Sequence, residues 1–199
     1  MNNTEIIKQY IKESMDTKGK ILSDAGILSK INEAADIIVN AYKSGRKTLL
    51  AGNGGSAADA QHIAGEFVSR FYFDRPGIPS IALTTDTSIL TAIGNDYGYE
   101  KLFARQVAAQ GLEGDVFIGI STSGNSQNIV EALKVCRQKK IKTIGFTGIT
   151  PCEMDGLCDI VLKVPSASTP RIQESHIMLG HIICGIVEAA LFTPISQPK

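Results

Sequence analysis

The sequence predicts an α/β fold built around a parallel β-sheet of about five strands, flanked by helices. Two observations support this prediction. From Lys47 onward, short apolar runs alternate with segments of helical periodicity, which is the pattern of βαβ units. Loops rich in glycine and serine follow these runs, and ligands bind at that edge of such sheets. Residues 1–199 contain no internal repeat, low-complexity tract or linker, so we expect a single domain.

Two helices are expected before the first strand, at 4–24 and 27–44, where apolar side chains recur at helical spacing. We expect them to form an antiparallel hairpin, with Gly26 between them and Gly45 after the second. Apolar side chains lie all around the first helix, which is more apolar surface than an edge helix of a monomer needs. Residues 1–45 are therefore predicted to be a helical extension used in oligomerisation.

The remaining elements follow in alternation. The predicted strands are residues 48–51, 80–83, 116–120, 143–146 and 160–164. The predicted helices are residues 55–70, about 88–110 with a break near Gly94 or Gly98, 126–139, and a long C-terminal helix from 169 to 192. Functional residues are expected in the loops at the carboxyl ends of the strands.

The composition excludes several classes of function. Twenty basic and twenty acidic residues cancel, so neither nucleic acid nor an anionic membrane surface is expected as the main partner. The N-terminus lacks a cationic start followed by an apolar stretch, and no run of eighteen apolar residues occurs, which predicts a cytoplasmic protein. The four cysteines have no C-x-x-C spacing and are expected to be reduced, structural thiols.

A glycine turn, Gly52-Asn53-Gly54-Gly55, follows the first strand. Exposed backbone N–H groups in such a turn can hold an anion or a polyol, and Ser56 is expected to cap the helix that follows. A dinucleotide fingerprint does not fit, because its third glycine would fall at Ala57.

On the predicted helix 55–70, His62 and Glu66 are four residues apart and so share one face. Gln173 and His181 on the last helix could also bind a divalent metal ion. These two residues are about 12 Å apart along an uninterrupted helix, so one ion cannot easily bind both within one chain. Either Gln173 precedes the regular helix or a neighbouring subunit contributes one of the pair, and we favour a site at a subunit interface. For His176 we expect a structural hydrogen bond.

A second loop, Ser121-Thr122-Ser123-Gly124-Asn125-Ser126, leads from a strand into a helix. Hydroxyls and N–H groups at a helix N-terminus can bind a phosphate without a lysine. The alternative is a serine-rich N-cap and turn. The spacing and the lysine of a P-loop are missing.

Together, these motifs resemble the sugar isomerase (SIS) domain family, and within it the bacterial sedoheptulose-7-phosphate isomerases. The resemblance covers nearly the whole chain. It is carried by the segment from Gly52 to His62, by Asn95-Asp96, by the Ser121–Ser126 loop and by Arg171-Ile172-Gln173-Glu174. An acidic residue precedes that last segment in some relatives, whereas Pro170 does so here.

The resemblance implies a homotetramer with active sites at subunit interfaces. It also implies conversion of D-sedoheptulose 7-phosphate to D-glycero-D-manno-heptose 7-phosphate, on the route to the heptose of lipopolysaccharide. By the matching motifs, the resemblance implies that one Zn²⁺ per site is bound by His62, Glu66, Gln173 and His181. It also implies that Glu66 and His181 are the acid/base pair. The implied substrate-binding residues are Asn53, Gly54, Gly55, Ser56, Glu66, Arg70, Asn95, Asp96, Ser121, Thr122, Ser123, Ser126 and Gln173.

A non-enzymatic protein of the same fold, which binds the replication initiator, also resembles this chain. The presence of both Glu66 and His181 favours the enzyme, because ketose–aldose isomerisation needs two groups that carry protons. A sugar-sensing regulator would need a DNA-binding domain, and the N-terminal helices lack a basic recognition surface.

Overall fold

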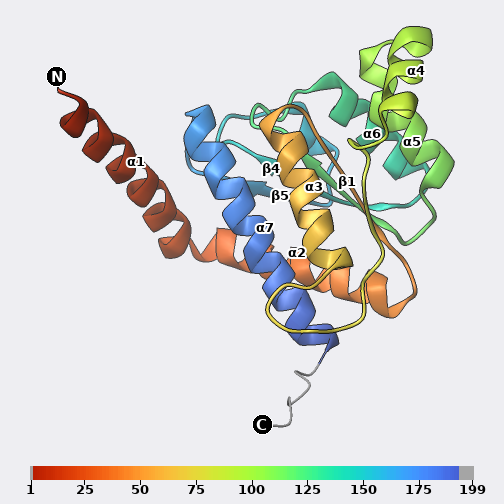
Figure 1. The fold of residues 1–199 in the computed structure, drawn as a ribbon, viewed down its shortest axis with the longest axis horizontal. Helices are drawn as coiled ribbons and strands as arrows, with labels where there is room; N and C mark the ends of the chain where they lie inside the picture. Colours follow the sequence, from red (N-terminus) through yellow and green to blue (C-terminus); the bar gives the residue numbers. More distant parts are fainter. Residues whose placement is uncertain (1, 193–199) are drawn as a thin grey trace.

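The computed structural model describes residues 2–192, so Met1 and residues 193–199 of the expected domain lie outside the described residues. A five-stranded parallel sheet forms the middle layer, in the order β2-β1-β3-β4-β5 (Figure 1). The predicted fold class is confirmed. The strands are β1 Thr48–Gly52, β2 Ser80–Ala82, β3 Val116–Ile120, β4 Lys142–Thr147 and β5 Ile160–Lys163.

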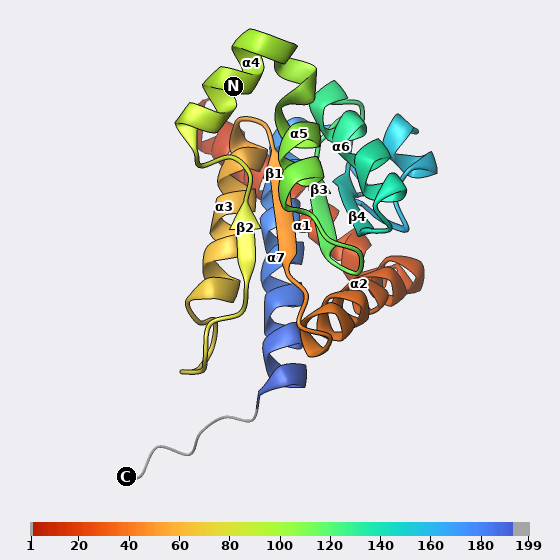
Figure 2. The same ribbon diagram turned by 90° about the vertical axis from the view of Figure 1, so that its right-hand side faces the viewer.

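Helices cover both faces of the sheet (Figure 2). On one face lie α2 (Ala25–Lys43), α3 (Gly55–Val68) and α7 (Thr169–Leu191). The other face is covered by α4 (Thr87–Tyr97), α5 (Leu102–Gln110) and α6 (Gln127–Gln138). Successive side chains of a strand point to opposite faces of the sheet. Leu49 and Leu50 of β1 belong to the apolar clusters on the two different faces, and both are fully buried. This explains why the strands read as continuous apolar runs.

From β1 the chain adds β2 on one side and β3, β4 and β5 on the other, so the order of the strands reverses between β1 and β3. These two strands are neighbours, with Gly52 in register with Ile120, so their carboxyl ends meet. The helix after β1 packs on one face of the sheet and the helix after β3 on the other. In sheets of this order the crevice between such divergent helices is where ligands bind. The glycine turn and the serine loop are therefore brought together.

The N-terminal helices differ from the expected hairpin. α1 (Asn3–Ser23) and α2 are separated by Asp24 alone, and Gly26 lies inside the first turn of α2. The Asp24 backbone is extended and its carboxylate accepts hydrogen bonds from Gly26 N and Ile27 N, which starts α2 at once. One linking residue is too short for α1 to fold back along α2, so the N-terminal part of α1 projects from the body (Figure 1). Its C-terminal half is anchored by the buried Thr17 and Ile21, and Arg171 of α7 donates to the Tyr10 carbonyl. The prediction of an antiparallel hairpin was wrong.

Two other boundaries have clear causes. The predicted break in the helix 88–110 falls at Gly98, whose φ of +89° is left-handed, and a 3-10 turn, η1 (Tyr99–Lys101), follows it. Gly45 has a φ of +68° just beyond α2, as predicted. A further 3-10 turn is η2 (Glu153–Gly156).

Among the described residues, α7 is the one helix long and apolar enough to cross a membrane by length and composition. In this fold its apolar side chains have another use. Leu179, Ile183 and Val187 are buried in the cluster that α7 shares with α2, α3 and the sheet. The apolarity of α7 is that of a core helix.

Candidate active site

Three of the predicted ligand residues come together between α3 and α7, which lie side by side (Figure 1). Nε2 of His62 is 2.9 Å from Nε2 of His181 and 3.1 Å from Oε1 of Glu66. The three ligand atoms lie within 4.8 Å of one another. Zinc–nitrogen distances of about 2.0 Å place two tetrahedral ligands about 3.3 Å apart. The cluster therefore fits a divalent metal ion in both donor chemistry and spacing.

Gln173 is not part of this cluster within one chain. α7 begins at Thr169, so Gln173 lies in regular helix, two turns before His181. The alternative in which Gln173 precedes the helix is therefore wrong. Instead the Gln173 amide packs on the glycine turn, where a Cβ added to Gly55 would lie 2.8 Å from Nε2. Only glycine fits at position 55 while this amide stays in place.

The glycine turn itself differs from the prediction in one respect. α3 starts at Gly55, its N-cap is Gly54 with a φ of +55°, and no side chain caps it. Ser56 is instead buried in the first turn and packs against Gly52, so the prediction that Ser56 is the N-cap was wrong. Ser56 N and Ala57 N donate to the carbonyls of Asn53 and Gly54, each at 3.0 Å, so the turn itself satisfies part of this helix end.

In the serine loop the hydroxyls point toward one another. Oγ of the buried Ser121 is 2.9 Å from Oγ of Ser126 and 3.4 Å from Oγ of Ser123. Ser126 occupies the N-cap position of α6, but its side chain makes no capping hydrogen bond. Ser121 and Ser123 also accept hydrogen bonds from Gly124 N and Asn125 N, as in a serine-rich turn. Three hydroxyls thus lie together at a helix N-terminus, a position that can stabilise a phosphate.

Asn128 joins the two loops, and the sequence interpretation missed it. Its amide and that of Asn53 exchange hydrogen bonds of 2.9 and 2.8 Å, and the Tyr99 hydroxyl donates to Oδ1 of Asn53 at 3.0 Å. Asn128 is 2% exposed, on the buried side of α6. Asn53 and Tyr99 also line a cavity of about 350 Å³ beside the glycine turn. The available signal was a lone asparagine at a position of α6 that helical periodicity assigns to the core.

Other predicted substrate-binding residues are not gathered here. Asn95 and Asp96 are exposed near the end of α4 and bond to each other at 2.8 Å. Arg70 is exposed beyond α3, and the carbonyl of Thr122 accepts a hydrogen bond from Gly148 N. Pro170 lies in the first turn of α7, where its missing N–H leaves no gap in the helix.

Two further titratable groups on α3 and α7 have shifted pKa values: Asp59 is half-buried and His176 is fully buried. Burial raises the pKa of Asp59 to about 6, against the opposing effect of His62, and its Oδ2 has no partner among the described residues. Burial lowers the pKa of His176 to about 4, although a hydrogen bond to the Thr147 carbonyl acts the other way. The expected structural hydrogen bond of His176 is confirmed, at 3.2 Å.

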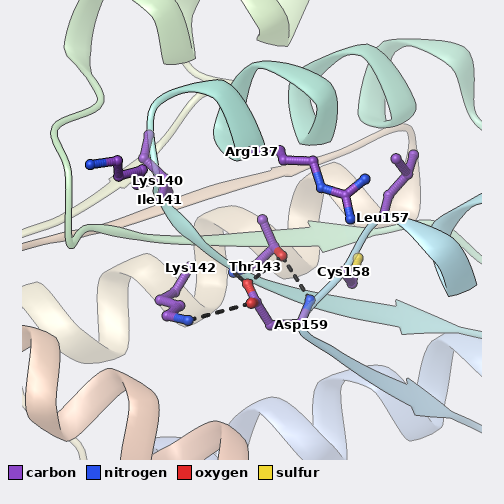
Figure 3. Close-up of a pocket in the computed structure, with 8 residues that line it drawn as sticks. All are labelled: Arg137, Lys140, Ile141, Lys142, Thr143, Leu157, Cys158 and Asp159. Carbon is purple, nitrogen blue, oxygen red and sulfur yellow. Dashed lines mark hydrogen bonds and ion pairs between the residues drawn. The ribbon is translucent and has the colours of Figure 1, made fainter.

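A pocket at the opposite, amino edge of the sheet is less suited to a ligand (Figure 3). Asp159, one of its lining residues, already accepts hydrogen bonds from the N–H and hydroxyl of Thr143, each 2.8 Å, and pairs with Lys142 at 3.5 Å. The Arg137 side chain extends toward Leu157 (Figure 3). Burial raises the pKa of the Cys158 thiol to about 12, so the thiol stays protonated. Asp159, Thr143 and Lys142 thus satisfy one another.

Comparisons with known proteins agree with this geometry. Residues 9–148 match the SIS domain family. The chain is 66% identical over 191 residues to phosphoheptose isomerase 2 of Campylobacter jejuni, which covers 96% of this chain and 95% of that protein. It is 64% identical over 188 residues to phosphoheptose isomerase of Aneurinibacillus thermoaerophilus, covering 94% and 95%. The solved structure of phosphoheptose isomerase GmhA from Neisseria gonorrhoeae is 39% identical with a TM-score of 0.89, covering 94% of this chain and 100% of that one.

The expectation of an isomerase, in preference to a protein that binds the replication initiator, is confirmed by these relatives. The resemblance inferred from the glycine turn and the serine loop is confirmed as well. The chain belongs to the SIS domain family and, within it, to the phosphoheptose isomerases.

Proposed function

We propose that this chain converts D-sedoheptulose 7-phosphate to D-glycero-D-manno-heptose 7-phosphate, in the supply of heptose for lipopolysaccharide. The observation that carries this proposal is the cluster of His62, Glu66 and His181 in a chain of this family. A ketose–aldose isomerisation moves one proton between two carbons and another between two oxygens. A carboxylate and an imidazole at one site can carry both.

Glu66 is the proposed base for the carbon-bound proton. Its Oε1 faces His62 at 3.1 Å, which leaves Oε2 to take the proton from C1 and return it to C2. The side chain is 24% exposed, so substrate can reach it. His181 is the proposed carrier of the proton that moves between the two sugar oxygens. General acid/base groups of this kind typically contribute about 10² to 10⁴ in rate.

The metal ion is proposed to be Zn²⁺, held by His62, Glu66 and His181 of one chain. The fourth proposed ligand, Gln173, would come from another copy, because it is two turns away from His181 on α7. An ion held by these residues would supply Lewis-acid stabilisation of negative charge that develops on the sugar oxygens. Chelation is expected to abolish activity and added Zn²⁺ to restore it; full activity of the metal-free chain would contradict this role.

The phosphate is proposed to bind at the serine loop and the sugar hydroxyls at the glycine turn. Ser121, Ser123 and Ser126 supply converging hydroxyls, and Asn53, Gly54 and Gly55 supply the turn. Thr122, Ser56, Arg70, Asn95 and Asp96 remain proposed substrate-binding residues, to be tested individually.

Residues 1–199 are proposed to act as one domain, and residues 1–45 to serve in assembly of a cytoplasmic homotetramer. Five apolar side chains of α1 are more than half exposed: Ile7, Tyr10, Ile11, Met15 and Leu22. A helix that projects from the body with such a surface needs a partner, and another copy of this chain suits it. An assembly of this kind would also bring Gln173 of one copy to the cluster of another.

The decisive experiment incubates the purified, zinc-loaded chain with D-sedoheptulose 7-phosphate and follows the aldose proton by NMR. We expect the heptose aldose to accumulate to equilibrium. Fructose 6-phosphate and ribulose 5-phosphate serve as shorter substrates that test the selection of seven carbons. An unchanged ketose in a sample whose zinc content is verified would overturn the proposal.

A further inference from the structure

A buried ion pair lies below the candidate active site, outside the residues assigned to it. Nε of Arg75 is 3.0 Å from Oε1 of Glu188, and the two side chains are 2% and 1% exposed. Arg75 belongs to the loop between α3 and β2, whereas Glu188 lies near the end of α7. The pair therefore connects the segment that follows Glu66 to the helix that carries His181.

Arg75 caps the end of α3. Its Nη2 donates to the carbonyl of Glu66 at 2.7 Å, and its Nη1 donates to the carbonyl of Phe67 at 2.8 Å and that of Ser69 at 3.2 Å. The last carbonyls of a helix have no partner within it, and a cation there is favoured by the helix dipole. The guanidinium thus fixes the backbone of Glu66 itself.

Glu188 holds the start of the same loop. Its Oε1 and Oε2 accept hydrogen bonds from Phe71 N at 2.8 Å and Tyr72 N at 2.7 Å. Burial alone would raise the pKa of Glu188, but these N–H groups and the guanidinium hold it below its usual range, so the carboxyl stays ionised.

The loop also touches His181 directly. The ring of Phe71 lies 5.6 Å from the ring of His181, centroid to centroid, with an interplanar angle of 37°. Glu188 follows His181 by two helical turns on the same side of α7. Arg75 and Glu188 therefore set both the end of α3 and the contact that supports the His181 ring.

We propose that Arg75 and Glu188 are positioning residues for the isomerisation, which hold Glu66 and His181 at their working separation by fastening α3 to α7. This inference rests on the proposed function. Burying two charges is costly, and a buried ion pair is weak evidence for a role in stability alone. Catalytic geometry is more sensitive, because a displacement of about 1 Å can cost about 100-fold in rate.

The fold provides a matched control at its opposite edge. Asp115, also 1% exposed, pairs with Lys47 at 2.6 Å and accepts hydrogen bonds from two backbone N–H groups, those of Lys47 and Leu112. It precedes β3, at the amino edge of the sheet, whereas the candidate active site uses the carboxyl edge. Asp115→Asn therefore removes a comparable buried carboxylate charge without touching α3 or α7.

The experiment compares Glu188→Gln with Asp115→Asn at a temperature where both are folded. For Glu188→Gln we expect kcat to fall by about 10- to 100-fold while KM changes less than about twofold, because the serine loop is not disturbed. Co²⁺ titration followed by its visible absorption gives a readout independent of turnover, and Glu188→Gln is expected to bind Co²⁺ about 10-fold more weakly. Asp115→Asn should match the wild type in both measurements.

Arg75→Lys provides a second test, because lysine keeps the charge but cannot reach the three carbonyls in the same way. It should lower kcat in the same direction as Glu188→Gln, and Glu188→Asp replaces Glu188→Gln if the latter does not fold. If the wild type is active, and Glu188→Gln has the same kcat and the same Co²⁺ affinity as Asp115→Asn, the positioning role is overturned. An inactive wild type that binds Co²⁺ would instead overturn the proposed function and leave the Co²⁺ comparison to test the positioning.

Discussion

The amides of Asn53 and Asn128 form a reciprocal pair of hydrogen bonds, of 2.9 and 2.8 Å, across the crevice between β1 and β3. Asn53 belongs to the glycine turn and Asn128 to the first turn of the helix after the serine loop. Within the pair each amide donates once and accepts once, and Oδ1 of Asn53 also accepts from the Tyr99 hydroxyl, so the orientation of both amides is fixed. This pair therefore fixes the position of the glycine turn relative to the serine loop, the two parts of the proposed sugar-phosphate site.

Replacing Asn128 by alanine should therefore weaken substrate binding. The substitution removes one hydrogen-bond partner from Nδ2 and one from Oδ1 of Asn53. We expect KM to rise by about 10-fold, because a buried polar group left unpaired costs about 1–2 kcal/mol. kcat should change much less, because His62, Glu66 and His181 are untouched. Steady-state kinetics test this, and an unaltered KM would exclude the coupling of the two loops.

Glu66→Gln and His181→Gln address the acid/base pair. Both substitutions keep the approximate size of the side chain and remove its ability to carry a proton. We expect kcat to fall by about 10² to 10⁴ in each case, with substrate binding still measurable by calorimetry. Near-wild-type turnover in either variant would remove that residue from its proposed role.

The serine loop is tested by a double substitution, Ser121→Ala with Ser126→Ala. These hydroxyls lie 2.9 Å apart, so removing both avoids leaving a single unpaired one. KM for sedoheptulose 7-phosphate should rise by at least about 10-fold, because two hydrogen bonds to a charged phosphate are lost. As a comparison, affinity for the unphosphorylated ketose should hardly change. Equal effects on both sugars would show that the loop does not bind phosphate.

His176 predicts how stability depends on pH. Its pKa is lowered from 6.5 to about 4 in the folded chain. Between these values the unfolded chain binds a proton that the folded chain does not, so stability falls as pH falls from 6.5 toward 4, by about 3 kcal/mol in all. Urea unfolding of the wild type and His176→Gln at pH 7 and pH 4.5 tests this. The variant should lose less stability over this interval, and parallel losses would contradict the assignment.

The exposed apolar side chains of α1 predict that a charge introduced there weakens the proposed tetramer. Ile11 is 56% exposed on α1, and Leu112 is 54% exposed in the loop before β3. Ile11→Glu should lower the mass measured by light scattering from that of a tetramer, whereas Leu112→Glu, matched in exposure, should not. If both variants keep the wild-type mass, α1 does not form the interface.

The fold could be read from the sequence largely because its signals are local. The central strands β1 and β3 are short apolar runs buried on both faces, and Gly98 ends a helix through its own left-handed backbone. The errors were also local. Ser56 resembled an N-cap, but Gly54, with a φ of +55°, is the N-cap, and α3 therefore starts two residues earlier than a Ser56 cap would allow. At Asp24, the pattern gave no information on the angle between two helices that one residue joins.

The candidate site was predictable only in part. His62 and Glu66 share a helix face, so their spacing placed them together. The approach of His181 depends on how α7 packs against α3, which a pattern within either helix does not specify. Asn128, Arg75 and Glu188 were missed because their roles arise from partners distant in the chain, and single polar residues in helices and loops usually face solvent.

The position of α7 has a consequence for the making of the protein. His62 and His181 are 119 residues apart, and the helix that delivers His181 is the last described element of the chain. A ribosome completes it after every strand, so the growing polypeptide carries half of the site until the end. A prematurely terminated product without α7 would expose the apolar surfaces of α2 and α3 and lack His181. The core on this face of the sheet and the His62, Glu66 and His181 cluster thus both depend on the same helix.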